Sequence, residues 1–258
     1  MTSHPSGTSG PFDPAYARPS EYRTGKAPAV RPKDAATLIL VRHDAKAPQV
    51  LMGKRHADHA FMPNKYVFPG GRVDRADSRI APAKDLSPRV QRRLMDRMRG
   101  GPPSPARARA YALAAVRETF EETGLLVGMP NTGAIPTSRH ADWNAYFRHG
   151  ALPDLSRVDL VARAITPPYR TRRFDTRFFM GDASSILSDL HDTRAASGEL
   201  LDLHWLTLKE ARALELPNIT RAVLAEIETR LRTPDSGTRR PVPFIYFRGR
   251  RPVQDVIP

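Results

Sequence analysis

The chain has 258 residues, a formal net charge of +14 and 40% hydrophobic residues. These values predict one elaborated domain around a single sizeable core, and they exclude a chain that is disordered throughout. The absence of cysteine excludes disulfides, thiolate catalysis and cysteine-ligated zinc. Because neither a run of 18 apolar residues nor a secretory signal pattern occurs, we expect a cytoplasmic protein without a membrane-spanning helix.

The first part of the chain consists of an arm followed by strand patterns. Residues 1–34 are rich in proline, serine and glycine, which predicts a disordered or loosely packed arm. The apolar run at residues 36–41 predicts a buried strand, and residues 49–55 suit its partner after a turn. We therefore expect a single domain over residues 35–258.

Two Ser-Pro pairs predict where the next helices begin. In Ser87-Pro88 and in Ser104-Pro105 the serine can cap a helix, and the proline suits the first helical position. We expect the first helix to stop at Gly100-Gly101 and the second to end at Thr123-Gly124.

The remaining residues alternate between strand and helix patterns. Strands are predicted at residues 125–127, 173–180, 199–206 and 243–247. Helices are predicted at residues 138–150, 208–214 and 220–231. We expect Trp143 and Trp205 to belong to the core. This order predicts an α/β or α+β fold with a mixed sheet flanked by helices.

Three carboxylates stand close together in the last turns of the second helix. Glu118, Glu121 and Glu122 share one face at helical spacing, whereas Val116 and Phe120 point toward a core. Clustered carboxylates repel one another unless a cation bridges them, and an all-oxygen donor set favours Mg²⁺ or Mn²⁺. A solvated acidic helix face is the alternative that the carboxylates alone leave open.

The segment from Arg117 to Leu125, together with Phe68-Pro69-Gly70-Gly71 upstream, resembles the box motif of the Nudix hydrolase family. Thr119 replaces an aliphatic residue of that motif, and Asp77 stands where the family has glutamate. Residues 78–116 number 39 where the motif has seven, so about 32 residues are inserted. This combination resembles the branch of the peroxisomal Nudix coenzyme A diphosphatase and its bacterial relatives.

The resemblance implies a Nudix-type α/β/α sandwich with a helical insertion, at about residues 78–104, inside the box. It also implies Mg²⁺ or Mn²⁺ as cofactor, held by Glu118, Glu121, Glu122 and the carbonyl of Gly70. Arg117 would orient this cluster, with a surface ion pair to Glu121 as the alternative. The general base is either Glu118 or Glu199, and Asp74 and Asp77 either anchor their loop or contact metal through water.

The implied reaction is hydrolysis of a diphosphate bond in a small nucleotide-derived substrate. Coenzyme A or acyl-coenzyme A is the leading expectation, and ADP-ribose, NADH and dinucleoside polyphosphates are alternatives. Arginines suit substrate phosphates because their planar forks bind phosphate oxygens bidentately. The candidates are Arg55, Arg170, Arg172 and Arg173.

Basic residues are concentrated in two segments, residues 84–109 and 230–251. Such segments attract polyanions, so a nucleic-acid role such as RNA 5′-end processing is a further alternative. No aromatic residues interleave with the arginines of residues 84–109, as a single-strand binding surface would prefer. For the insertion, a flap over the active site and a homodimer contact are the simpler interpretations.

Overall fold

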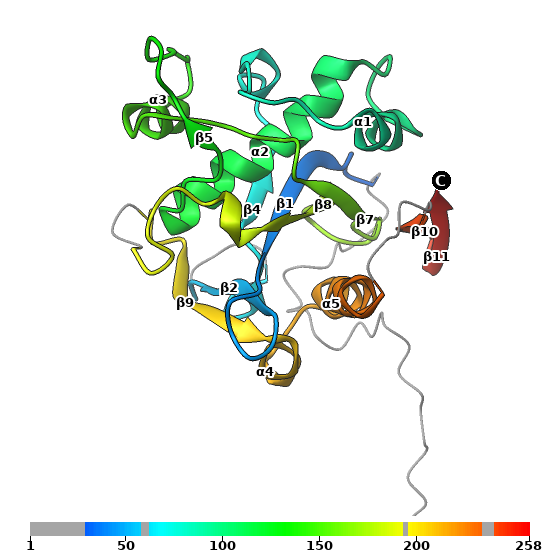
Figure 1. Cartoon of the computed structure of the whole chain (residues 1–258). Coiled ribbons are helices and arrows are strands. Elements are labelled where there is room, and N and C mark those ends of the chain that lie inside the picture. Colours follow the sequence, from blue (N-terminus) through cyan, green and yellow to red (C-terminus); the bar gives the residue numbers. More distant parts are fainter. Residues whose placement is uncertain (1–28, 58–61, 193–195, 234–239) are drawn as a thin grey trace, which may run out of the picture.

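The computed structural model describes residues 29–57, 62–192, 196–233 and 240–258, and a mixed sheet runs through their centre (Figure 1). The main path of the sheet has the strand order β11-β10-β7-β8-β1-β2-β3, while β4 pairs with β1 and β9 pairs with β2. The β1–β8 and β7–β10 pairs are parallel, and the other pairs of this sheet are antiparallel. The sheet is therefore mixed, as the sequence predicts.

The strands of the sheet are mostly short and carry apolar residues on both faces. Their bounds are Lys33–Arg42 (β1), Gln49–Arg55 (β2), Tyr66–Val67 (β3), Gly70–Arg72 (β4), Asp159–Ile165 (β7), Phe174–Asp182 (β8), Leu200–Thr207 (β9), Val242–Arg248 (β10) and Arg251–Ile257 (β11). A separate two-stranded ribbon is formed by Met129–Pro130 (β5) and Ala151–Leu152 (β6). Strand β7 is buried along nearly its whole length and β1 along most of its middle, because helices cover both faces of the sheet.

Helices begin where the sequence supplies caps. The helices are Pro88–Met95 (α1), Pro105–Thr123 (α2), Ala141–Arg148 (α3), Leu208–Ala213 (α4) and Asn218–Arg232 (α5), and short 3₁₀ turns occupy Asp77–Arg79 and Ala183–Ser185. The side chains of Ser87 and Ser104 accept the predicted capping hydrogen bonds. Helix α2 ends at Gly124, whose φ of 78° is the left-handed conformation that glycine adopts most easily.

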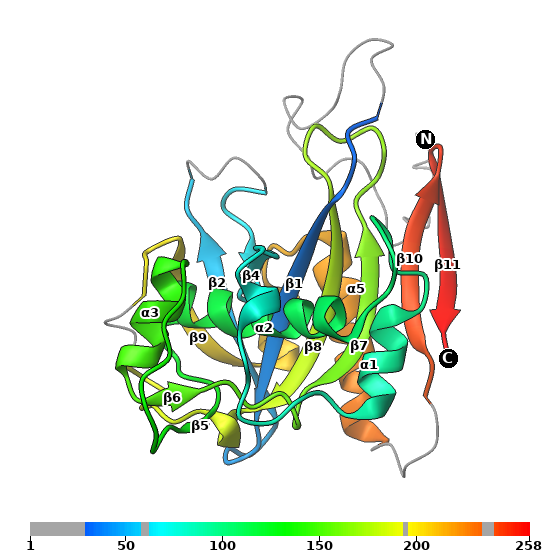
Figure 2. The same ribbon diagram turned by 90° about the horizontal axis from the view of Figure 1, so that it is seen from above.

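The sheet separates two apolar clusters, one on each face. Helix α2 packs across β1 and β4 on one face together with α1 and α3, and Leu38, Leu113 and Phe179 belong to that core. Helix α5 covers the other face, where Ile39 and Leu224 are fully buried. Figure 2 shows the same layers from above, with α2 crossing the strands. The fold is an α/β/α sandwich, as expected.

Most predicted helices and strands are confirmed, and six strands were missed. The predicted strand at residues 125–127 forms only one isolated bridge, at Val127, and the first insertion helix ends at Met95, ahead of the predicted stop. Strands β7 and β11 and the short strands β3, β4, β5 and β6 were not predicted. The predicted N-terminal arm lies largely outside the described residues, and β1 already begins at Lys33. None of the helices within the described ranges has the length and apolarity needed to cross a membrane.

The insertion packs on the sheet, near its C-terminal edge. Arg93 of α1 is buried and donates hydrogen bonds to the backbone carbonyls of Arg240 and Pro258. Arg97, just after α1, forms an ion pair with Asp255 of β11. Arg163 of β7 donates to the carbonyls that end the insertion helix. These contacts attach residues 88–97 to the body of the domain.

Candidate active site

A cavity of about 630 Å³ lies beside the last two turns of α2. Its walls also come from β1, the β3–β4 segment, the loop after β7, the start of α5, and β10. The volume is within the range typical of small-molecule sites. No residue between 78 and 116 lines this cavity, so the flap interpretation of the insertion is wrong for this structure.

The three helix carboxylates all reach the cavity. Glu118, Glu121 and Glu122 line it, together with Gly70 and Glu199. Glu122 is the most enclosed of the three, and its Oε2 accepts a hydrogen bond of 2.7 Å from the backbone N–H of Gly70. The face is therefore not a solvated surface stripe, because the cavity withdraws these carboxylates from bulk water.

Burial without a full set of counter-charges shifts the titration of these carboxylates upward. Burial raises the pKa of Glu122 to about 8, against the opposing effect of the Arg55 charge and the Gly70 hydrogen bond. The pKa of Glu121 rises to about 7 through burial and the neighbouring charges of Glu118 and Asp142. Burial also raises the pKa of Glu118, although Arg117 opposes it. The cluster is short of positive charge.

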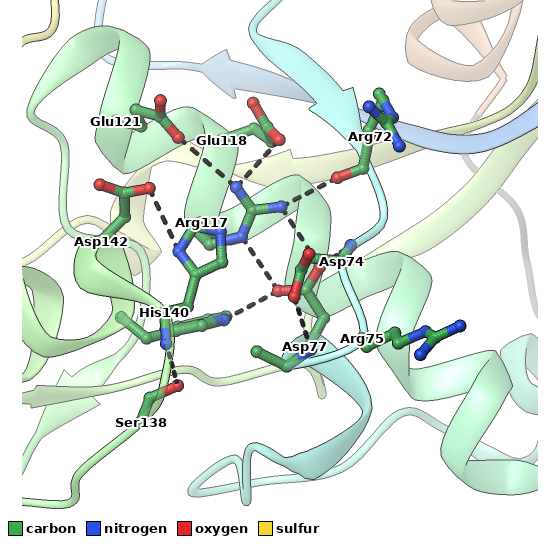
Figure 3. A network of polar contacts seen from close by, with 12 residues as sticks. Arg72, Asp74, Arg75, Asp77, Arg117, Glu118, Glu121, Ser138, His140 and Asp142 are labelled. Atoms are coloured by element: carbon green, nitrogen blue, oxygen red, sulfur yellow. Dashed lines mark hydrogen bonds and ion pairs between the residues drawn. The ribbon is translucent and has the colours of Figure 1, made fainter.

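Arg117 is the centre of the polar network drawn in Figure 3. Its Nη1 donates to Glu118 at 2.9 Å and to Glu121 at 3.4 Å, and its Nη2 donates to the carbonyl of Arg72. Its Nε and Nη2 donate to the two carboxylate oxygens of Asp77 at 3.0 and 3.2 Å. Arg117 is 2% exposed, so the surface ion pair considered from sequence is wrong.

The charges around Arg117 keep it ionised. Burial alone would lower its pKa, but the hydrogen bond to Asp77 and the charges of Glu118 and Asp77 raise the pKa above its ordinary value. One buried guanidinium therefore joins the β4 segment, the 3₁₀ turn at Asp77 and the carboxylate face of α2.

Asp77 takes part in this network although it is shorter than the family's glutamate. It is fully buried, and it accepts a hydrogen bond from the backbone N–H of Asp74 at 2.8 Å. The indole N–H of Trp143 also donates to Asp77, at 2.8 Å. Trp143 is fully buried, which confirms its predicted place in the core, but its polar edge also supports Asp77. Of the two roles expected for Asp74 and Asp77, the structure displays the anchoring of their loop.

Two glycines allow backbone and carboxylates to approach closely. A Cβ on Gly71 would lie 2.3 Å from one carboxylate oxygen of Glu118, inside van der Waals contact. A Cβ on Gly70 would lie 2.5 Å from the carbonyl oxygen of Ala36 in the neighbouring strand. Gly70 therefore excludes a side chain for a steric reason, whereas a Cβ at Gly71 would require the flexible Glu118 carboxylate to move.

The donor set fits a hard divalent cation by its chemistry. Carboxylate oxygens and a backbone carbonyl are the ligands that Mg²⁺ and Mn²⁺ prefer, and burial, with neighbouring carboxylates, raises the pKa of Glu121 and of Glu122, so both gain from a bound cation. In the part of the chain that the structure describes, no three histidine or acidic side chains are grouped closely enough to hold a metal ion. Glu118 and Glu121 instead lie against Arg117.

The predicted phosphate-binding arginines are only partly brought together. Arg55, Arg170 and Arg172 line the cavity, whereas Arg173 is directed elsewhere. The side chain of Arg173 donates to the backbone carbonyls of Thr166 and Val30, so it holds the N-terminal strand in place. The expectation that Arg173 binds substrate is therefore not supported by its position.

Glu199 lies in the same cavity as the helix carboxylates. The loop before it is tied to α2, because the N–H of Ser197 donates to the carbonyl of Glu121 at 2.7 Å. Glu199 itself is exposed, unlike Glu122. The two candidate bases, Glu118 and Glu199, therefore line the same cavity.

Two cavity residues were missed from the sequence. His140 and Asp142 line the cavity at the start of α3, with 3.2 Å between His140 Nδ1 and an Asp142 carboxylate oxygen. Asp142 contributes to the raised pKa of Glu121. Neither residue stands in a recognisable motif, and only the packing of α3 against α2 brings them to the site.

This sandwich, with a glutamate-bearing helix at the edge of a cavity, defines the class of Nudix hydrolases. The family model of the NUDT19 Nudix domain matches residues 32–216. Because this match covers more than half of the chain, the chain belongs to that family, whose members are hydrolases acting on pyrophosphate bonds. The resemblance inferred from the box residues is confirmed.

Similar proteins agree with this assignment. Acyl-coenzyme A diphosphatase NUDT19 of Gallus gallus is 28% identical over an alignment of 180 residues, and the match covers 51% of this chain and 47% of that protein. Putative nudix hydrolase 7 of Caenorhabditis elegans is 26% identical over 190 residues, 69% of this chain and 52% of that protein. The chain spans about half the length of these curated relatives.

A solved structure supports the fold as well. The NUDIX hydrolase from Alicyclobacillus acidocaldarius is 27% identical and superposes with a TM-score of 0.53. The match covers 76% of this chain and 90% of that one.

Proposed function

We propose that this protein hydrolyses the diphosphate bond of coenzyme A or acyl-coenzyme A. The products would be 3′,5′-ADP and 4′-phosphopantetheine or its acylated form. The observation that carries the proposal is one cavity that contains Glu118, Glu121 and Glu122 beside the arginines Arg55 and Arg170. The similarity to the chicken relative, an acyl-coenzyme A diphosphatase, supports the choice of substrate.

The residues that would hold Mg²⁺ or Mn²⁺ are Glu118, Glu121, Glu122 and the carbonyl of Gly70. A bound divalent ion would neutralise phosphate charge and acidify water. Arg117 fixes the rotamers of Glu118 and Glu121 by donating to both carboxylates. The backbone N–H of Gly70 donates to the Glu122 carboxylate. This hydrogen bond keeps the Glu122 carboxylate close to the Gly70 carbonyl.

The proton of the attacking water must go to a base as the new P–O bond forms and the bond to the leaving phosphate breaks. Glu118 and Glu199 are the two candidates. Glu118 already accepts a hydrogen bond from Arg117, which stabilises its ionised form. Glu199 is exposed, and its charge contributes to the raised pKa of Glu118 and of Glu122. The kcat of Glu199→Gln decides between them, because Glu118 would also hold the metal and its loss lowers kcat in either case. A large loss of kcat in Glu199→Gln assigns the base to Glu199, and a nearly unchanged kcat assigns it to Glu118.

Substrate phosphates would be bound by arginines in the cavity. Arg55 is enclosed near the carboxylates, and although burial lowers its pKa, the charges of Glu122, Glu199 and Glu118 oppose that shift. Arg170 and Arg172 approach from the loop after β7. Arginines on two different elements of one cavity suit a substrate that carries a diphosphate and a further phosphate.

The test is incubation of the purified protein with coenzyme A and either Mg²⁺ or Mn²⁺, followed by mass spectrometry of the products. We expect 3′,5′-ADP and 4′-phosphopantetheine from the parent and neither product from Glu121→Gln. Parallel reactions with ADP-ribose, NADH and a dinucleoside polyphosphate serve as the comparison. If the protein cleaves one of these compounds and not coenzyme A, the proposed substrate is wrong and the proposed reaction, diphosphate hydrolysis, is retained.

Cytoplasmic location and a homodimer stay predictions from the sequence. The nucleic-acid alternative loses one of its arginines, because Arg93 is buried against backbone carbonyls. Arg92 and Arg99 remain exposed in that segment.

A further inference from the structure

The cavity continues from its charged end into an apolar part. Beside the glutamates and arginines it is lined by Ile165, Phe174 and Phe178 of the sheet and its loop. A substrate that only needed its phosphates bound would not require such a surface. The apolar part therefore indicates that a second, hydrocarbon-like portion of the ligand lies against the sheet.

One wall of this apolar part comes from beyond the matched family domain. The family match ends at residue 216. The cavity residues that follow it form what we call the C-terminal wall: Pro217, Asn218, Ile219, Thr220, Ile245 and Phe247. They belong to the start of α5 and to β10.

The alternation of β10 directs its residues to opposite faces. Ile245 and Phe247 lie on the cavity face, two residues apart as strand geometry requires. Phe244 and Tyr246 point to the other face, where they pack against the α2-side core. Parallel pairing of Ile245 with Ala164 of β7 fixes the position of the wall in the sheet.

The loop after β7 joins the charged and apolar parts of the cavity. Tyr169 packs edge-to-face on Phe247, with ring centroids 6.1 Å apart. Its neighbour Arg170 is one of the proposed phosphate-binding residues. A ligand with its phosphates at the arginines would thus reach the C-terminal wall without leaving the cavity.

We propose that the C-terminal wall binds the acyl chain of an acyl-coenzyme A and gives preference for acylated over free coenzyme A. This inference rests on the proposed function. Four of the six wall residues offer only hydrocarbon surface, and Asn218 and Thr220 are the polar exceptions. An adenine ring would leave polar edges facing hydrocarbon, which is costly, whereas an acyl chain has no polar edge to satisfy.

The experiment compares kcat/KM for octanoyl-coenzyme A and coenzyme A in the parent, Phe247→Ala and Tyr246→Ala. Tyr246→Ala is the matched control, since it removes an aromatic ring from the opposite face of the same strand. We expect Phe247→Ala to lower the octanoyl-to-free ratio about tenfold, the lower range for lost apolar pocket contacts. We expect Tyr246→Ala to leave that ratio unchanged.

Two results would overturn the inference. The first is an unchanged ratio in Phe247→Ala, and the second is an equal loss with both substrates, as expected if the wall held the shared nucleotide. Ile219→Ala, on α5, provides a second truncation if Phe247→Ala does not fold.

If the parent cleaves neither substrate, the proposed function fails, and binding decides the inference separately. Calorimetric titration with octanoyl-coenzyme A in EDTA would then support acyl binding by the C-terminal wall if Phe247→Ala weakens binding about tenfold. Equal binding by parent and variant would refute it.

Discussion

Replacing Glu122 by glutamine is expected to stabilise the metal-free protein. Glu122 is 3% exposed, and burial raises its pKa from 4.5 to about 8. Between these two values the unfolded chain has lost the proton while the folded protein still holds it. Stability of the folded state therefore falls as pH rises through this window, and it stays low above pH 8. Glutamine carries no charge and can still accept the Gly70 hydrogen bond. It therefore removes the free-energy cost of a buried, ionised carboxylate.

The magnitude follows from the same two values. At pH 7 the shift corresponds to about 3 kcal/mol of unfolding free energy, and above pH 8 to about 5 kcal/mol, as upper bounds. Below about pH 4.5 the two proteins should be equally stable. With roughly 2–4 °C per kcal/mol for a domain of this size, the variant should melt about 6–12 °C higher at pH 7.

The assay is urea unfolding and thermal melting in EDTA at several pH values between 4.5 and 9. Glu199→Gln is the matched control, because it makes the same chemical change at an exposed carboxylate in the same cavity. Adding Mg²⁺ should then stabilise the parent more than Glu122→Gln, since binding to the folded state adds stability. A Glu122→Gln variant no more stable than the parent at pH 8 in EDTA would refute the reasoning.

Two further changes test the support of the carboxylates. Trp143→Phe removes the donor to Asp77 and should cost about 1.5–3 kcal/mol of unfolding free energy, the range for a hydrogen bond to a charged group. Trp205→Phe, whose indole N–H donates to a neutral carbonyl, should cost no more than about 1 kcal/mol; equal costs in urea unfolding would contradict the role given to Trp143. Gly71→Ala should displace the Glu118 carboxylate, lowering kcat about 100-fold with little change in melting temperature. An unaltered kcat in a folded Gly71→Ala variant would show that catalysis does not depend on the exact position of the Glu118 carboxylate.

The helix that carries the carboxylates could be predicted because its signals are local. Ser104-Pro105 marks its start, Gly124 its end, and Glu118, Glu121 and Glu122 follow helical spacing. The partners of those carboxylates could not be predicted. His140 and Asp142 reach the cavity only through the packing of α3, which no local pattern encodes.

The two long strands that were missed, β7 and β11, have identifiable physical causes. Strand β7 carries Arg163 in the middle of an apolar run, which reads as a break in a buried strand. In the structure this side chain is neutralised by a bidentate ion pair with Asp175 of β8, and it stacks on Phe244. Strand β11 includes Pro252 and Asp255, residues that are depleted in central strands but tolerated at the edge of a sheet.

The long insertion in the box is compatible with the site because the contact that joins the two halves is tertiary. Asp77 precedes the insertion and Arg117 follows it, yet they meet in two hydrogen bonds. The insertion leaves and re-enters the body at these points, and α1 is held at the C-terminal edge of the sheet by Arg93. Since loop closure depends only weakly on loop length, about 32 extra residues need not disturb this contact. The shorter reach of aspartate is offset by the 3₁₀ turn and by Trp143, which fix Asp77 against the guanidinium.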